Sequence, residues 1–100
     1  MTQPTPSAPP VSEPADTRLR RLRMRAWRRG TKEMDLILGP WADAHLADLP
    51  EATLDGFEVL LEENDQDLYA WITGQTAAPP AHAELLSRIA THARDRFRAR

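Results

Sequence analysis

The chain has 100 residues, 41% of them hydrophobic, so it has room for one small domain. Its formal net charge of -2 disfavours a generic nucleic-acid-binding protein, because such proteins usually carry an overall basic balance. With no cysteine, disulfides, thiolate zinc sites and cysteine nucleophiles are excluded. No apolar run approaches the roughly 20 residues that span a bilayer, so we expect a soluble protein without direct membrane insertion.

Residues 1–17 are expected to form a disordered tail, because they carry five prolines among Thr, Ser, Gln and Ala and show no apolar periodicity. Residues 18–100 are predicted to form the single domain, a helical bundle. The amino terminus has neither the apolar core of a signal peptide nor an Arg-rich, acid-poor presequence. A cytoplasmic location, in a bacterium, is therefore predicted.

The first helix is predicted over residues 18–29, with Asp16 or Thr17 as its N-cap. Gly30 is expected to end this helix in the left-handed conformation that glycine adopts without steric cost. Apolar residues recur at three- and four-residue spacing, with Trp27 beside them: Leu19, Leu22 and Ala26.

The second helix begins after Thr31, which can cap it, and carries Glu33 and Asp35 in its first turn, where negative charge is favoured. Gly39 and Pro40 interrupt the pattern, so we expect a kink or a break there. The apolar positions of this helix are Met34, Ile37, Leu38 and Trp41, followed by His45.

Three further helices complete an all-α fold, a small bundle of five short helices. The third begins near Pro50, the fourth is capped by Asp65 and ends at Gly74, and the fifth follows a loop and begins at Pro80. The third helix is predicted to have an apolar stripe of Leu54, Phe57, Leu60 and Leu61, the fourth carries Leu68, Tyr69, Trp71 and Ile72, and the fifth has Leu85, Leu86, Ile89, Ala93 and Phe97 inward.

Charge divides the chain at residues 32 and 33. Residues 18–32 contain eight basic residues and no acid, whereas residues 33–67 contain eleven acids and no Lys or Arg. The basic first helix favours either a solvated amphipathic helix or, as the alternative function, a small helical protein that binds nucleic acid phosphates. The acidic middle argues against nucleic acid, since it would repel phosphates unless it faced away.

Catalytic patterns are absent from the sequence. His45, His82 and His92 are far apart and match no metal-ligand spacing, and no GxSxG motif or glycine-rich phosphate loop occurs. The acids between Glu58 and Asp67 lack the glycine and the glutamate that a calcium loop requires. We therefore predict that the protein is not an enzyme and binds no metal or cofactor of its own.

The corner between the first two helices is the strongest candidate for a binding site. Arg29 and Glu33 lie on either side of it, and Gly30 would permit close approach of a partner to the backbone. The alternative is that Gly30 only ends a helix and Glu33 is only a favourable first-turn acid.

Residues 28–35, with the sequence RRGTKEMD, resemble the RGxxE signature of the succinate dehydrogenase FAD assembly factor family. Downstream, the segments LLE at residues 60–62 and DQDLYAWI at residues 65–72 look like two further segments of that family. The resemblance covers roughly residues 18–97. Gln66 is a departure, because a proline is common at that position.

The resemblance implies a chaperone of five helices that binds the flavoprotein subunit of succinate dehydrogenase and promotes covalent attachment of FAD to it. Fumarate reductase is a further candidate partner. FAD would be attached to the partner, so no cofactor site is expected here, and we expect a monomer. The implied partner-binding residues are Arg28, Arg29, Gly30, Glu33 and Asp35.

Overall fold

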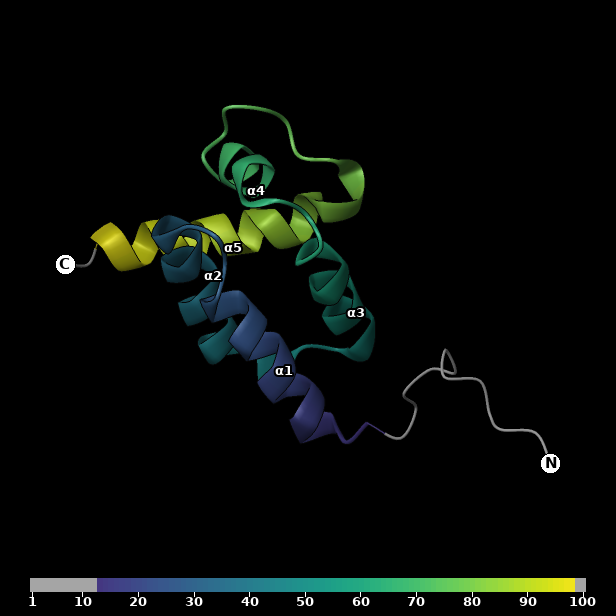
Figure 1. The fold of residues 1–100 in the computed structure, drawn as a ribbon. Coiled ribbons are helices and arrows are strands. Elements are labelled where there is room, and N and C mark those ends of the chain that lie inside the picture. Colours follow the sequence, from purple (N-terminus) through teal and green to yellow (C-terminus); the bar gives the residue numbers. More distant parts are fainter. Residues whose placement is uncertain (1–12, 99–100) are drawn as a thin grey trace.

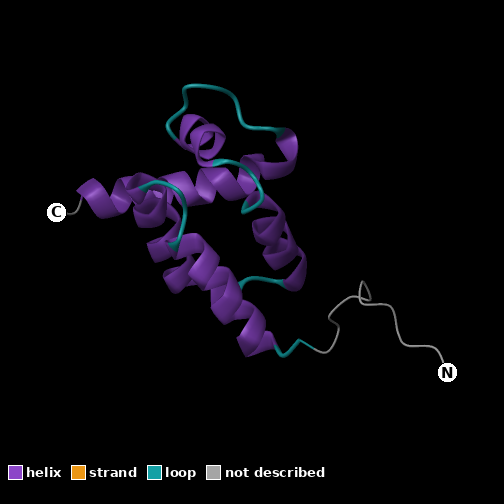
Figure 2. Ribbon diagram, viewed as in Figure 1, coloured by secondary structure: helices purple, strands orange, loops and turns teal. Residues whose placement is uncertain are grey.

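The computed structural model describes residues 13–98, and these residues form helices and connecting loops without any strand (Figure 2). Most of the predicted tail, residues 1–12, lies outside this part of the chain. The elements are α1 (Ala15–Trp27), α2 (Lys32–His45), the 3-10 turn η1 (Leu46–Asp48), α3 (Glu51–Leu60), α4 (Asp65–Ile72) and α5 (Pro80–Arg98). The predicted all-α bundle of five helices is confirmed.

The helices surround one core, to which every helix contributes. α1 packs along α2, and α5 crosses the bundle in contact with α2, α3 and α4 (Figure 1). The rings of Trp41 and Phe57 stack at the centre, with centroids 5.4 Å apart. The largest of the fully buried side chains around them are Leu22, Met34, Leu38, Leu46, Leu60, Leu68 and Ile89. No described helix is long and apolar enough to cross a membrane.

Helix α2 continues through Pro40, so the predicted alternative of a break is wrong. Proline has no N–H to donate to the carbonyl four residues earlier, which is that of Leu36. Arg96 of α5 supplies the missing donor, because its Nη1 donates to the Leu36 carbonyl over 3.0 Å. A long-range side chain thus satisfies the acceptor that the proline leaves open.

Gly39 lets Trp27 lie flat against α2. A Cβ at Gly39 would stand 2.3 Å from the Trp27 ring, so no larger residue fits without moving the indole. The Trp27 Nε1 donates to Asp43 over 3.2 Å and fixes the ring in that place. This glycine therefore serves close packing between α1 and α2 rather than a turn.

Two predicted helix starts are wrong. α1 begins at Ala15 with Pro14 at its N-cap, and not after Asp16 or Thr17. The cap needs only its carbonyl for the first helical bond, and Pro14 accepts from the Arg18 N–H over 3.0 Å, so a proline suffices. At α4 the cap is Asn64, whose side chain accepts from the Asp67 N–H over 2.9 Å. Asp65 is thereby left free for another contact.

Other predicted ends are confirmed. Thr31 caps α2 by accepting from the Met34 N–H, and Gly74 follows α4 with a left-handed φ of 81°. At the far end of α5, Phe97 is exposed, which contradicts its predicted inward position. The last turn of α5 extends beyond the rest of the bundle (Figure 1), so no helix is there to cover it.

Candidate functional site

The corner between α1 and α2 is residues 28–31, and an acid from α4 closes it. The Asp65 carboxylate accepts from the Arg29 Nε over 2.8 Å, and its other oxygen accepts from the N–H groups of Gly30 (2.6 Å) and Thr31 (3.1 Å). These charge-assisted bonds are the strong class of hydrogen bond. They fix the corner to the first turn of α4, 35 residues away in sequence.

Each nitrogen of the Arg29 guanidinium donates a hydrogen bond to a group of the same chain. Besides Asp65, the guanidinium donates to the carbonyls of Leu61 (2.8 Å) and Glu63 (2.7 Å), which are left open where α3 ends. The side chains of Arg29 and Asp65 are only 11% and 12% exposed. Removing one partner of such a nearly buried pair typically costs about 3–5 kcal/mol, because the remaining charge stays buried and unpaired.

Gly30 does not have the predicted left-handed conformation. Its φ is not positive, and α1 already ends at Trp27 with Arg28 as the C-cap. A Cβ on Gly30 would lie 3.2 Å from the nearer Asp65 carboxylate oxygen, which is tighter than an ordinary contact. Asp65 of the same chain approaches the Gly30 backbone closely, and the approach of a partner there stays a prediction.

The five predicted partner-binding residues divide into two kinds. Arg29 and Gly30 bind Asp65, and Asp35 accepts from the Arg29 N–H, so these three hold the corner together. Arg28 and Glu33 are exposed and form no ion pair or side-chain hydrogen bond with the described residues. Only the second kind is available to a partner through its side chains.

A surface hollow of about 390 Å³ opens beside the corner. Glu33 lies on one side of it and Tyr69 of α4, which is exposed, lies on another. The remaining lining residues are Thr31, Asp65, Gln66 and Gln75. Sequence reasoning assigned none of Asp65, Gln66, Tyr69 and Gln75 to the site, although the segment 65–72 belongs to the resemblance and could have pointed to three of them.

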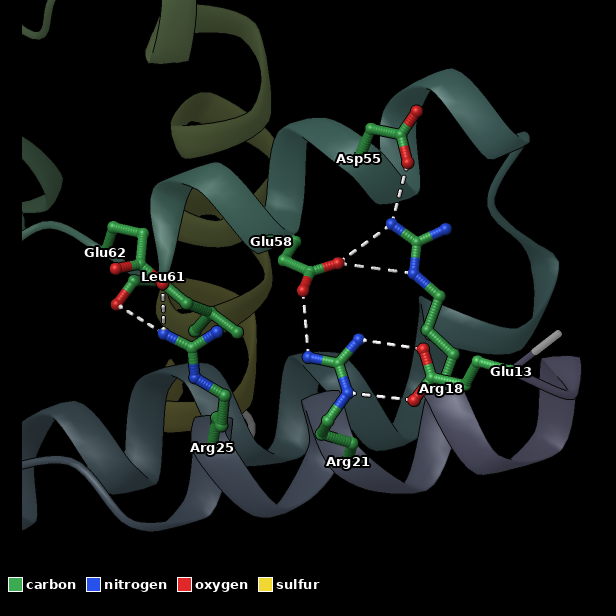
Figure 3. A network of polar contacts seen from close by, with 8 residues as sticks. All are labelled: Glu13, Arg18, Arg21, Arg25, Asp55, Glu58, Leu61 and Glu62. Carbon is green, nitrogen blue, oxygen red and sulfur yellow. Dashed lines mark hydrogen bonds and ion pairs between the residues drawn. The ribbon is translucent and has the colours of Figure 1, made fainter. Parts of the chain in front are cut away.

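A second polar cluster, here called the arginine ladder, joins α1 to α3 (Figure 3). Three arginines spaced along α1 point towards acids of α3 and of the turn after it, and Glu13 completes the cluster. Arg18 contacts Asp55 (2.7 Å) and Glu58 (2.9 Å). Arg21 contacts Glu58 (2.8 Å) and Glu13 (3.0 Å), and Arg25 contacts Glu62 (2.7 Å).

The ladder changes the interpretation of the basic helix. The Arg21 guanidinium, followed by that of Arg18, lowers the pKa of the Glu58 carboxyl below its ordinary value of 4.5. These arginines are engaged with acids of the same chain, so neither the solvated amphipathic helix nor the nucleic-acid alternative describes this face. Four of the eight basic residues between 18 and 32 pair with acids of the block at residues 33–67.

The histidines form no metal site in the part of the chain described, where no three potential ligands converge. His82 is buried and contacts Glu63 over 3.0 Å. His45 and His92 meet edge to face at 5.2 Å beside Trp41. Burial, with His45 and Arg96 nearby, lowers the pKa of His92 below its ordinary value of 6.5.

Comparisons with known proteins match residues 20–93 to a family described as flavinator of succinate dehydrogenase. The FAD assembly factor SdhE of Photobacterium profundum is 36% identical over 73% of this chain and 84% of its own length. That of Aliivibrio fischeri is 37% identical over 67% of this chain and 79% of its own. Succinate dehydrogenase assembly factor 2, mitochondrial, of Mycosarcoma maydis is 37% identical over 84% of this chain, which spans only 38% of that longer protein.

Proposed function

Because the chain belongs to the family of flavinators of succinate dehydrogenase, we propose that it is an assembly factor for that enzyme. It binds the flavoprotein subunit and promotes the covalent attachment of FAD to it. The observation that carries this proposal is the match over residues 20–93, which includes the corner, the ladder arginines Arg21 and Arg25 and all of α4. The bacterial relatives that match over most of their own length have the name FAD assembly factor.

The geometry of the corner supports a docking role. Asp65 and Arg29 hold the backbone of residues 28–31, so the exposed Glu33 stands at a fixed position beside the hollow. A preorganised surface loses little conformational entropy on binding. In this proposal Glu33 and Tyr69 contact the flavoprotein, and Arg29 and Asp65 are positioning residues.

The proposed role needs no catalytic residue in this chain. FAD becomes bonded to the partner, and this protein holds the flavoprotein in a conformation that lets the bond form. The flavoprotein of fumarate reductase is included as a second proposed partner. The cytoplasmic location and the monomeric state remain predictions.

Co-expression with the flavoprotein subunit, under conditions in which flavinylation is limiting, tests the function. Flavin fluorescence of the subunit on a denaturing gel measures covalent attachment. We expect strong fluorescence only when this chain is present, and a loss with Glu33→Ala. Arg94→Ala, an exposed change on α5, is the matched control and retains full activity. Equal covalent flavin with and without the chain would refute the proposal.

A further inference from the structure

The arginines of α1 lie in two rows, and only one row has a use within the chain. The inner row is the ladder, Arg18, Arg21 and Arg25, and it is continued by Arg29 at the corner. The outer row is Arg20, Arg23 and Arg28, and none of these forms an ion pair with the residues that the structure describes. Arg20 and Arg23 are three residues apart and share a face of α1, and Arg28 follows them as the C-cap of this helix.

Exposed apolar side chains lie next to the outer row of arginines. Met24 and Trp27 are 46% and 38% exposed, and they lie on the same face of α1 as Arg20. We call Arg20, Met24, Trp27 and Arg28 the outer face of α1. Met, Trp and Arg are enriched where proteins bind one another. The bundle uses Trp27 through its contact with Gly39 and its bond to Asp43, and it still leaves part of this ring and much of Met24 exposed.

The charge of the outer face is unbalanced. Surfaces selected only for solubility intersperse both signs of charge, whereas Asp16 is the only acid on α1 and Asp43 of α2, which accepts from Trp27, is an acid that borders the outer face. Neighbouring like charges on a helix also destabilise it slightly. A row of arginines without a carboxylate within 4.0 Å is therefore unfavourable for the isolated protein and favourable against an acidic surface.

The outer face is continuous with the corner. Met24 and Arg28 line a shallow hollow together with Arg25 and Arg29, so the surface passes from α1 to residues 28–31 without interruption. α1 lies at the outside of the bundle (Figure 1), and Arg20, Met24 and Arg28 are exposed. A partner seated on Glu33 and Arg28 thus reaches the outer face by extending along α1.

We propose that the outer face of α1 is a second docking surface, which binds an acidic patch of the flavoprotein subunit next to the corner. This inference rests on the proposed function and adds a surface to it. Arg20 and Arg28 steer and orient the approach, and Met24 and Trp27 supply the apolar contact.

Other occupants fit the same face less well. A helix that lies in a membrane surface needs a broad apolar side, but the apolar side of α1 is buried in the bundle. Nucleic acid binding draws its affinity from many neutralised phosphates, and along this segment only two arginines of α1 and the C-cap Arg28 lack a carboxylate partner among residues 13–98. A compact acidic protein patch matches both the small charge and the small apolar area.

The test is the association rate of the full chain with the purified flavoprotein subunit. The variant Arg20→Glu/Met24→Glu is expected to associate about tenfold more slowly than the wild type at low salt, with the difference shrinking to about twofold at 0.5 M salt. Thr91→Glu/Arg94→Glu makes the same change in charge on exposed positions of α5 and should stay within about twofold of the wild type. Circular dichroism confirms that both variants fold.

Two outcomes would refute the second docking surface and leave the proposed function standing. One is an equal loss of association rate in the α5 control, which would mean that only net charge matters. The other is an unchanged association rate of the α1 variant while the wild type binds the flavoprotein subunit and promotes its flavinylation. The milder Arg20→Gln/Met24→Gln, expected to slow association about threefold, replaces the variant if that one unfolds.

Binding to vesicles of anionic phospholipid is measured as a further test. If the α1 variant loses binding to the vesicles but keeps its binding to the flavoprotein subunit, the outer face of α1 binds membranes and the inference is wrong. If wild type does not bind the flavoprotein at all, the proposed function fails too.

Discussion

The corner and the arginine ladder use the same chemistry, arginine against carboxylate, in different surroundings. Arg29 and Arg25 lie one helical turn apart, and both reach towards the Leu61 carbonyl. Arg29 and its partner Asp65 are nearly buried, whereas Arg25 and its partner Glu62 are 34% and 69% exposed. Burial and the number of satisfied donors, rather than the charge pair, make the corner a structural centre and the ladder a surface feature.

The largest expected effect is on Arg29. Arg29→Ala should lower the free energy of unfolding by about 3–5 kcal/mol, because Asp65 and two carbonyls lose their donor while they remain buried. Arg25→Ala is the matched control and should cost under about 1 kcal/mol. Urea unfolding followed by circular dichroism measures both. Equal losses would mean that the corner and the ladder do not differ in the way described.

Alanine substitutions at Gly30 in the corner and at Gly56 of α3 should change the stability of the fold in opposite directions. Gly30→Ala places a Cβ 3.2 Å from the Asp65 carboxylate, which three hydrogen bonds hold in place, so we expect a loss of about 1 kcal/mol. Gly56 of α3 has open space around its missing Cβ and lies inside a helix. Gly56→Ala should therefore stabilise the fold by about 0.5–1 kcal/mol. Thermal unfolding of the two variants decides the matter, and a gain in Gly30→Ala would refute the tight contact.

Salt should distinguish the ladder from the corner. Glu58→Gln removes the charge that Arg18 and Arg21 share, and we expect a loss of about 0.5–1 kcal/mol at low ionic strength. In 0.5 M salt the wild type and the variant should converge, since exposed pairs are screened. The Arg29→Ala defect should persist there. A Glu58→Gln defect that is independent of salt would show that the ladder behaves as a buried cluster.

The smallest effect is a pH dependence that belongs to the ladder. The arginines lower the pKa of Glu58 in the folded state, so its contribution is complete above the unfolded value of about 4.5 and is lost as pH falls through the lower folded value. Glu58→Gln should flatten the stability curve only below about pH 4.5. Urea midpoints between pH 3 and pH 5 measure this, and an identical slope in both proteins contradicts it.

The variant His92→Gln is the control for the pH range in which the contribution of Glu58 is lost. The pKa of His92 is lowered by burial, so the unfolded state binds the proton first, and stability falls as pH drops from about 6.5. Below its lower folded pKa this contribution no longer changes with pH. His92→Gln should flatten the curve starting near pH 6.5, a higher pH than the onset for Glu58→Gln, because the two residues titrate in different ranges.

The sequence by itself determined the helices and most of their ends. Apolar spacing, the Thr31 cap and Gly74 follow from local rules, because a cap needs one side chain and one nearby N–H, and a left-handed glycine needs no neighbour. The resemblance located the corner at residues 28–35 in the same way, from a contiguous segment. Periodicity also supplied the apolar face of each helix, except where α5 extends past the bundle at Phe97.

Only the tertiary structure decided what the charged residues do. Arg29 was expected to face a partner, yet it binds Asp65, 36 residues away, and the closeness of Asp65 rather than a left-handed turn explains Gly30. No local pattern marks Arg96, yet its guanidinium donates to the Leu36 carbonyl that Pro40 leaves without a donor. Local patterns hold no information on such pairs, because an ion pair depends on which helices meet, and that depends on the packing of the whole core.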